Sequence, residues 1–347
     1  MEEADATHTP DLISVMAWAA LHENAPTAPP LEENNARINR SNEPLTPQEE
    51  EDARRAKILT HMQYGTLKHV SREELTELEY AKRLYTRLFT QRKRDGRPKG
   101  RTVAGTGSRA QDRTDLIKGQ NSGSYSPTVS TPAVFMTCAI AAHIRGSMTL
   151  AQRADHRFRQ CDIKAAYLNA EMTLETDAKT ERQFRRAVEM RGAEAETMVE
   201  MNKKHKWWGD GVTELHLGKS LFFILKKTLY GLLQAAVYRF ETMSRFLISV
   251  CEMTQSEEDL CVFYWKPTDK VEAIICLYID DLLIFSDQRF FDGIRCKMDE
   301  KFRSDSGESN NTYCENTTLD YLNLSLTNQD DGSITIDQES YITLIEA

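Results

Sequence analysis

The most informative part of the 347-residue sequence reads Ala273-Ile274-Ile275-Cys276-Leu277, then Tyr278-Ile279-Asp280-Asp281, then Leu282-Leu283-Ile284-Phe285. Each apolar run has the length and composition of a buried strand, and the short segment between them predicts the turn of a β-hairpin. The hairpin therefore presents two adjacent carboxylates, Asp280 and Asp281, at its tip.

Adjacent carboxylates beside buried strands raise each other's pKa unless a cation neutralises them. Mg²⁺ prefers oxygen ligands, and a pair of such ions can activate an attacking hydroxyl and stabilise a leaving pyrophosphate. A third carboxylate is expected nearby, and Asp162 is the candidate because it ends an apparent strand. The backbone carbonyl of the next residue, Ile163, could face a metal as well. An Asp-Asp pair is more often a solvated turn, so the apolar flanks are what favour a metal site.

The N-terminal third combines a polar lead-in with two helix signals. Residues 1 to about 45 contain several prolines and little hydrophobic periodicity, and we expect a flexible segment. Thr46-Pro47-Gln48-Glu49 predicts a helix start with a capping box. Ser71 with Glu74 predicts a second helix that continues through Phe89 on apolar residues at helical spacing.

Strands and helices alternate further along the chain. Asp95-Gly96 predicts the turn of a basic hairpin arm between residues 89 and 120, and residues 133–144 predict an apolar helix. Residues 221–225 predict a strand, followed by a helix that ends near Val250. Residues 173–215 are highly charged and predict an insertion of helix plus loop outside the core.

Composition sets weaker limits. The net charge of -9 argues against a nucleic-acid partner, but Arg92 to Lys118 carries nine Lys and Arg side chains against three Asp, which is a local basic patch. The seven cysteines are scattered without a Cys-x-x-Cys pair, so neither a disulfide framework nor a zinc site is expected. No apolar run approaches the ~20 residues that span a bilayer, and the acidic N-terminus is unlike a signal peptide. These features predict an intracellular protein without a membrane partner.

An ordered series of motifs resembles the reverse transcriptases of copia-type long-terminal-repeat retrotransposons, from about Leu67 to the C-terminus. The matching blocks are Arg94-Asp95-Gly96-x-x-Lys99-Gly100-Arg101, Ser126-Pro127-Thr128-Val129-Ser130, Cys161-Asp162-Ile163-Lys164-Ala165-Ala166-Tyr167-Leu168-Asn169-Ala170, Leu225-Lys226-Lys227-Thr228-Leu229-Tyr230-Gly231-Leu232-Leu233-Gln234-Ala235, Tyr278-Ile279-Asp280-Asp281-Leu282-Leu283-Ile284 and Asp320-Tyr321-Leu322-Asn323-Leu324.

The resemblance implies an α+β fold with the fingers and palm of a right-hand polymerase, in which helices back an antiparallel palm sheet. Fingers would occupy about 67–155 and palm about 156–347, within a reverse transcriptase domain at 46–347. Because the chain stops at Ala347, we expect most of the thumb, and any ribonuclease H or integrase region, to be absent.

The resemblance also implies roles for individual residues. Asp162, Asp280 and Asp281 would hold two Mg²⁺ ions, with Mn²⁺ as an alternative, for transfer of a nucleotide from a dNTP to a primer 3′-hydroxyl. Tyr167 would lie under the sugar and reject ribonucleotides, or else be a core aromatic. Gln234 would lie near the nucleotide, or be an exposed helix-start amide. Arg101, and less surely Lys99, would grip the triphosphate, or form a solvated basic loop.

The partners implied are an RNA or DNA template with its primer, dNTPs, and other parts of a Pol polyprotein, in a cytoplasmic virus-like particle or the nucleus. Three residues depart from the family pattern: Leu233 where Lys is usual, Ala236 where Pro is frequent, and Asn323 where Gly is usual. Asn323 is tolerable if its backbone is left-handed. Two alternatives stay open: a truncated or decayed element product that binds nucleic acid without polymerising, and an unrelated Mg²⁺-dependent phosphohydrolase, which would explain the carboxylates alone.

Overall fold

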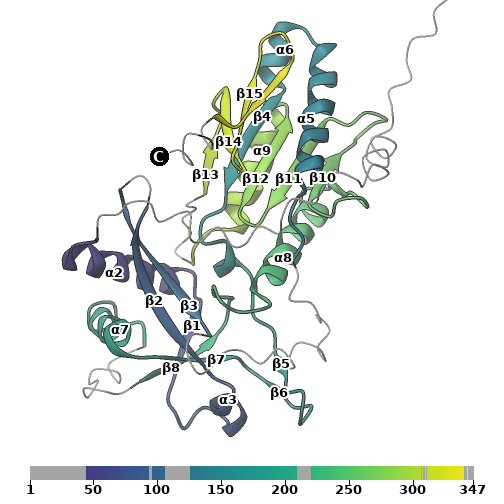
Figure 1. Ribbon diagram of the computed structural model, residues 1–347. Coiled ribbons are helices and arrows are strands. Elements are labelled where there is room, and N and C mark those ends of the chain that lie inside the picture. Colours follow the sequence, from purple (N-terminus) through teal and green to yellow (C-terminus); the bar gives the residue numbers. More distant parts are fainter. Residues whose placement is uncertain are drawn as a thin grey trace, which may run out of the picture.

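A computed structural model describes residues 44–93, 96–105, 126–208, 220–305, 307, 309, 311–339 and 342. In this part of the chain, helices combine with a five-stranded sheet, a six-stranded sheet, a three-stranded sheet and a two-stranded ribbon. The two large sheets lie in separate parts of the molecule, lower and upper in Figure 1. The expected mixture of α and β structure is therefore confirmed. None of the described helices is long and apolar enough to cross a membrane.

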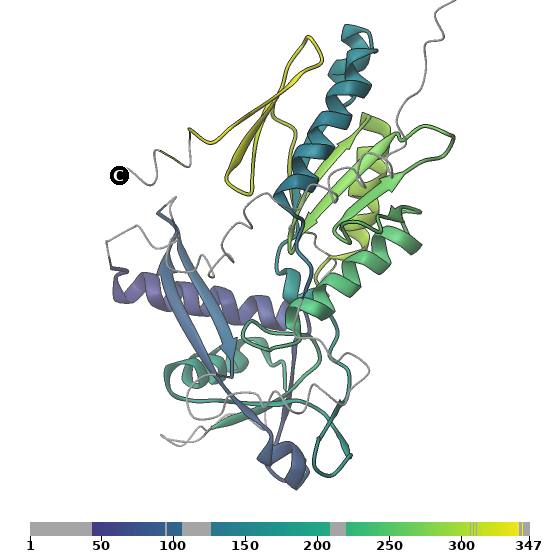
Figure 2. The same ribbon diagram turned by 45° about the vertical axis from the view of Figure 1, so that its right-hand side comes forward.

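The five-stranded sheet has the order β1-β8-β7-β2-β3. Its strands are β1 (Leu67–Val70), β8 (Leu221–Leu225), β7 (Ala187–Met190), β2 (Leu84–Arg92) and β3 (Pro98–Ala104). All neighbouring pairs are antiparallel except β2 and β7. Helix α2 (Pro47–Gln63) lies against the β2–β3 hairpin, and α7 (Gly192–His205) lies against α2 (Figures 1 and 2).

The six-stranded sheet has the order β13-β4-β12-β11-β10-β9, and every neighbouring pair is antiparallel. Its strands are β13 (Thr312–Cys314), β4 (Arg157–Asp162), β12 (Asp281–Ser286), β11 (Ala273–Tyr278), β10 (Val262–Trp265) and β9 (Thr254–Gln255). The central strands are buried on both faces, which explains why β11 and β12 read as continuous apolar runs rather than as alternating ones.

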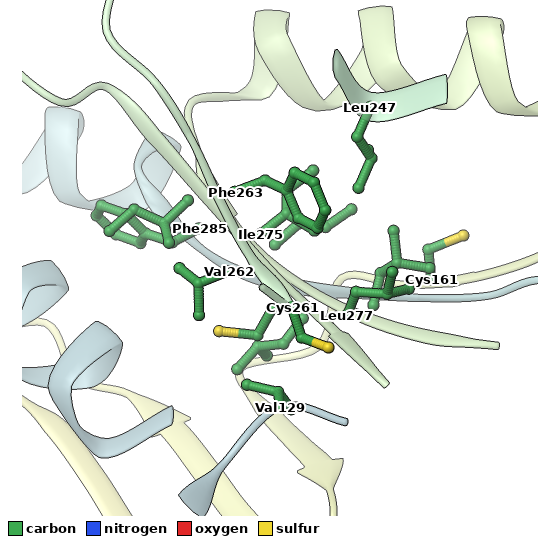
Figure 3. Packing of buried hydrophobic residues seen from close by; sticks show 14 of the residues in the cluster. Val129, Cys161, Leu247, Cys261, Val262, Phe263, Ile275, Leu277 and Phe285 are labelled. Carbon is green, nitrogen blue, oxygen red and sulfur yellow. The ribbon is translucent and has the colours of Figure 1, made fainter. Parts of the chain in front are cut away.

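Helices cover both faces of the six-stranded sheet. On one face, α8 (Ala235–Ser249) contributes Leu247, which lies beside Phe263 in Figure 3, and α9 (Gln288–Lys301) contributes Met298, whose sulfur lies 3.6 Å from that of Cys161. On the other face lie Val129 and helix α5 (Thr131–Gly146), where the Thr137 hydroxyl is 3.4 Å from the Cys276 sulfur. A short helix, α6 (Leu150–Asp155), connects α5 to β4.

The three-stranded sheet packs beside α5 and is formed by β14 (Thr318–Tyr321), β15 (Leu324–Asn328) and β16 (Ile334–Asp337) (Figure 2). The two-residue turn between β14 and β15 has positive φ at both Leu322 (+52°) and Asn323 (+64°). Positive φ at both central residues matches the twist of a two-residue hairpin. The expectation of a left-handed backbone at Asn323 is confirmed.

Several local predictions are confirmed. Thr46 caps α2, and both hydrogen bonds of its capping box with Glu49 are present. The basic arm is a hairpin, although Asp95 of its predicted turn lies outside the described residues. The helix predicted over 133–144, the strand over 221–225 and the helix ending near Val250 correspond to α5, β8 and α8. The predicted flexible segment lies almost wholly outside the described residues.

Other local predictions are wrong. Residues 71–89 do not form one helix: a single short helix, α3 (Glu77–Ala81), is followed by β2, because Leu84 and Tyr85 pair with β7 while the rest of the strand pairs with β3. Residues 173–208, the part of the predicted insertion that the structure describes, are not all outside the core. They include β5 (Glu175–Thr176), β6 (Gln183–Phe184) and the fully buried β7 in the middle of the five-stranded sheet.

The two large sheets are not built from separate halves of the chain. The five-stranded sheet takes β7 and β8 from beyond β4, whereas α5, which precedes β4, belongs to the core of the six-stranded sheet. The expected border between fingers and palm near residue 155 stays a prediction.

Candidate active site

The three predicted carboxylates meet at one end of the six-stranded sheet. Asp281 begins β12 and is the direct cross-strand partner of Asp162, the last residue of β4. Asp280 stands in the two-residue turn between β11 and β12, and its carbonyl accepts a hydrogen bond from the Ile163 backbone N–H at 2.8 Å. The Ile163 amide thus ties the end of β4 to the hairpin tip, and the metal contact expected of its carbonyl stays a prediction.

The backbone of the hairpin tip is strained. Ile279 has φ +55°, although its β-branched side chain makes a positive φ unfavourable. Such a conformation costs about 1–3 kcal/mol and persists where the surrounding structure enforces it. Here the buried β11 and β12 on either side enforce it, and the result is a sharp turn that brings Asp280 to the end of the sheet.

Burial and mutual repulsion act on these carboxyl groups. Burial raises the pKa of Asp280, and the charge of Asp162 adds to the rise. Burial also raises the pKa of Asp281 to about 7, with further contributions from Asp280 and Asp162, although the amide of Gln160 opposes the rise. A divalent cation bound between them would relieve this repulsion, since opposite charge favours the ionised form.

Two neighbours occupy the carboxylate oxygens. Gln160 donates from Nε2 to both oxygens of Asp281, at 2.8 and 2.9 Å, and Lys164 forms an ion pair with Asp162. No group of three potential metal-binding side chains is arranged around a common point in the described residues. The oxygen-rich donor set fits Mg²⁺ by its chemistry. Binding would require Gln160 and Lys164 to release these oxygens.

Tyr167 lies close to the carboxylates. It belongs to the short 3₁₀ helix Ala166–Asn169, which follows Ala165 at φ +52°. The half-buried ring contacts that of Tyr230, with 4.6 Å between centroids. Burial raises the pKa of Tyr167, and the charge of Asp280 adds to the rise, which places the phenol within electrostatic range of that carboxylate. Tyr167 also packs against the hydrophobic core of the five-stranded sheet, so the alternative of a core aromatic stays open.

Gln234 forms the N-cap of α8, whose N-terminal end packs against the 3₁₀ helix of Tyr167. Its side chain is only 1% exposed, so the alternative of an exposed helix-start amide is wrong.

The basic side chains come from the five-stranded sheet. Lys99 and Arg101 both lie on β3, two residues apart, and Arg101 stands 5.2 Å from the centre of the Tyr230 ring. Burial lowers the pKa of Lys99, and the charges of Lys93 and Arg101 lower it further, whereas the charge of Asp280 opposes these effects. The end of β3 is joined to the connection between β8 and α8 by a hydrogen bond of 2.8 Å from the Ala104 N–H to the Tyr230 carbonyl.

One buried cation at the site was not predicted. Arg239 on α8 is 1% exposed, and none of its three guanidinium nitrogens has a hydrogen-bond partner among the described residues. Burial lowers the pKa of Arg239 to about 10, and the charge of Asp280 is the largest influence that opposes this. The sequence gives no sign that Arg239 is buried, since an arginine on an amphipathic helix is ordinarily a surface residue.

Comparisons with known proteins identify the class of sequence. No protein-family model matches the chain. The Ty1-MR1 transposon Gag-Pol polyprotein of Saccharomyces cerevisiae is 28% identical over 293 residues, which are 82% of this chain and 13% of the polyprotein. The Ty1-NL2 polyprotein of the same yeast is 30% identical over 231 residues, which are 66% of this chain and 10% of the polyprotein.

The chain is a homologue of part of a retrotransposon Gag-Pol polyprotein. More particularly, its relatives are of the Ty1/copia type, which confirms the resemblance found in the motifs. The chain spans about an eighth of the length of these relatives.

Among solved structures, telomerase from Candida albicans with a fragment of telomeric RNA matches with a TM-score of 0.36 and 10% identity, over 78% of this chain and 49% of that chain. Telomerase from Candida tropicalis matches with a TM-score of 0.34 and 11% identity, over 82% and 52%.

Proposed function

We propose that the chain is the catalytic core of an RNA-directed DNA polymerase, a reverse transcriptase that joins a deoxynucleotide to a primer 3′-hydroxyl. The observation that carries the proposal is the meeting of Asp162, Asp280 and Asp281 at the paired ends of β4 and β12. In this proposal the six-stranded sheet with its helices is the palm, and the five-stranded sheet with α2 and α7 is the fingers.

The donor set supports two-metal chemistry. Mg²⁺, or Mn²⁺ in its place, would be held by Asp162, Asp280 and Asp281, and would lower the pKa of the 3′-hydroxyl and stabilise the leaving pyrophosphate. The 3′-oxygen attacks the α-phosphorus, the bond to the β-phosphate oxygen breaks, and pyrophosphate leaves. The sharp turn at Ile279 would hold the backbone of Asp280 and Asp281 in place before substrate arrives, while their side chains exchange Gln160 and Lys164 for metal.

The remaining residues bind and orient the nucleotide. Lys99 and Arg101 would bind the triphosphate from β3, for which the fork of a guanidinium is suited; Arg101 lies beside the Tyr230 ring, which contacts Tyr167. The Tyr167 ring, held against Tyr230, would lie under the sugar and exclude a 2′-hydroxyl by contact. Gln234 would position the sugar and base from the start of α8.

The test is Mg²⁺-dependent extension of a DNA primer on an RNA template by the purified chain. Asp280→Asn and Asp281→Asn should each abolish extension. Asp269→Asn is the matched control because Asp269 is exposed in the loop between β10 and β11, at the opposite end of the hairpin, and should extend normally. Equal extension by all four proteins would refute the assignment of the site.

The second candidate is an element product that binds nucleic acid without polymerising. The ion pair of Lys164 with Asp162, and the hydrogen bonds of Gln160 to Asp281, favour it because they occupy the oxygens that catalysis needs. Template binding that weakens steeply with salt, without extension under any metal condition, would decide for it. In either case the partners proposed are nucleic acid and other parts of the polyprotein, in a cytoplasmic particle or the nucleus.

A further inference from the structure

Helix α2 brings a third cation to the basic side of the site. Lys57 stands 5.9 Å from the centre of the Tyr230 ring, the same ring that Arg101 approaches at 5.2 Å. Lys57 and Arg101 therefore converge on one aromatic side chain from two different elements, a helix and a strand. Tyr230 in turn contacts Tyr167 of the site, with 4.6 Å between centroids.

The position of Lys57 depends on Gly100. A Cβ added at Gly100 would lie 2.6 Å from the Ala53 carbonyl oxygen and 2.9 Å from the Lys57 Cβ. These distances are far below van der Waals contact, so only glycine allows β3 to approach α2 this closely. Gly100 lies between Lys99 and Arg101, so the close approach brings α2 against the strand that carries both cations, and Lys57 and Arg101 reach the same Tyr230 ring.

Lys57 lacks a compensating negative charge in the part of the chain that the structure describes: its ammonium group has neither a hydrogen bond nor an ion pair there. Burial, together with the charges of Lys99 and Arg101, lowers the pKa of Lys57 to about 8. Like charges held together in a half-buried site are unfavourable unless an anion joins them.

We infer that Lys57 is a third polyphosphate-binding residue, which together with Lys99 and Arg101 holds the triphosphate of the incoming nucleotide and the pyrophosphate that leaves. The inference rests on the proposed function for the identity of the nucleotide. It adds to the proposed function a triphosphate-binding residue from α2, in addition to Lys99 and Arg101 on the β2–β3 hairpin. A dense polyanion is the occupant that neutralises three cations at once, and a single carboxylate is not.

The experiment measures binding of inorganic tripolyphosphate to the full chain by calorimetry, in the absence of primer and template. Lys57→Met retains the length and apolar stem of the side chain, and should weaken binding roughly 10-fold or more, since a charge-assisted contact is lost. Lys204→Met is the matched control, because Lys204 is exposed on α7, and should bind as the parent does.

The binding experiment tests the role of Lys57 separately from the proposed polymerase activity. Unchanged binding by Lys57→Met, or no binding of tripolyphosphate by the parent, would overturn the inference even if the parent extends primers. Binding that depends on Lys57 in a protein that extends no primer would support the inference and remove the polymerase proposal. In an active parent, Lys57→Met should also raise KM for the dNTP while leaving the Kd for primer-template unchanged.

Discussion

Replacing Glu194 should change the pH dependence of stability. Glu194 lies in the first turn of α7 and is 6% exposed; its Oε2 accepts a hydrogen bond of 3.0 Å from Thr86 on β2, and its Oε1 has no hydrogen-bond partner among the described residues. Burial raises the pKa of Glu194 to about 7, from an ordinary value of 4.5. The side chain is therefore protonated in the folded state at a pH where the unfolded chain has lost the proton.

The sign and size of the effect of pH on stability follow from this difference between the folded and unfolded pKa. Below pH 4.5 both states are protonated, and stability does not depend on this group. Between pH 4.5 and 7 the folded state holds a proton that the unfolded state has lost, so stability falls as pH rises. Each pH unit costs about 1.4 kcal/mol, and the full loss above pH 7 is therefore about 3 kcal/mol.

Glu194→Gln removes the ionisation and retains an oxygen that can accept the Thr86 hydrogen bond. At pH 8.5 the variant should exceed the parent in free energy of unfolding by about 2–3 kcal/mol, and at pH 4.5 the two should be equal. Urea denaturation at a series of pH values measures this difference. Glu196→Gln, on the exposed side of the same helix, is the matched control and should follow the parent.

Equal stability of Glu194→Gln and the parent at pH 8.5 would refute the reasoning, because an ionised Glu194 would then be solvated in the folded state. The prediction bears on the site, since Thr86 belongs to the hairpin that carries Lys99 and Arg101. Deprotonation of Glu194 therefore places a buried charge at the contact between this hairpin and α7, and burial makes that charge unfavourable.

Two further predictions concern the metal and the junction between the sheets. Asp281→Asn should lose most of the stabilisation that 10 mM Mg²⁺ gives the parent in thermal denaturation, about 1.4 kcal/mol for a Kd near 1 mM; an equal gain in both proteins would place the bound ion elsewhere. Gly231→Ala should lower the free energy of unfolding by about 3 kcal/mol, because φ is +87° and the new Cβ would lie 2.3 Å from the Ala104 carbonyl oxygen. Gly146→Ala, where a Cβ meets nothing within 4 Å, should be neutral or slightly stabilising, and similar losses in both variants would contradict the proposed clash.

The features that the sequence predicted correctly depend on residues that are close together in the chain. The apolar runs beside Asp280 and Asp281 are buried on both faces, so their pattern predicts strands without knowledge of neighbours. The capping box of Thr46 and the left-handed backbone of Asn323 depend on adjacent residues alone.

The prediction of a solvated insertion at residues 173–215 was wrong because some of its charged side chains form ion pairs inside the protein. Residues 173–215 contain Arg186 and Glu189, which suggested a solvated insertion. In the structure Arg186 donates to Glu175 at 2.7 Å, and Glu189 accepts from Arg83 at 2.6 Å, both in buried surroundings. Arg83 precedes the predicted insertion, and sequence spacing cannot show that it pairs with Glu189. Lys57 and Arg239 were missed for the same reason, because their surroundings come from distant segments.

The interleaving of the two large sheets has a consequence for synthesis of the protein on the ribosome. Strand β2 needs β7 as its neighbour, and about 100 residues, including the start of the other sheet, are made between them. At ~5–20 residues per second this interval lasts roughly 5–20 s, during which one edge of the β2–β3 hairpin stays open. An open strand edge is a template for pairing with other chains. We therefore expect the nascent hairpin to be prone to pairing with other chains during this interval, and slower translation should increase the aggregated fraction of newly made protein.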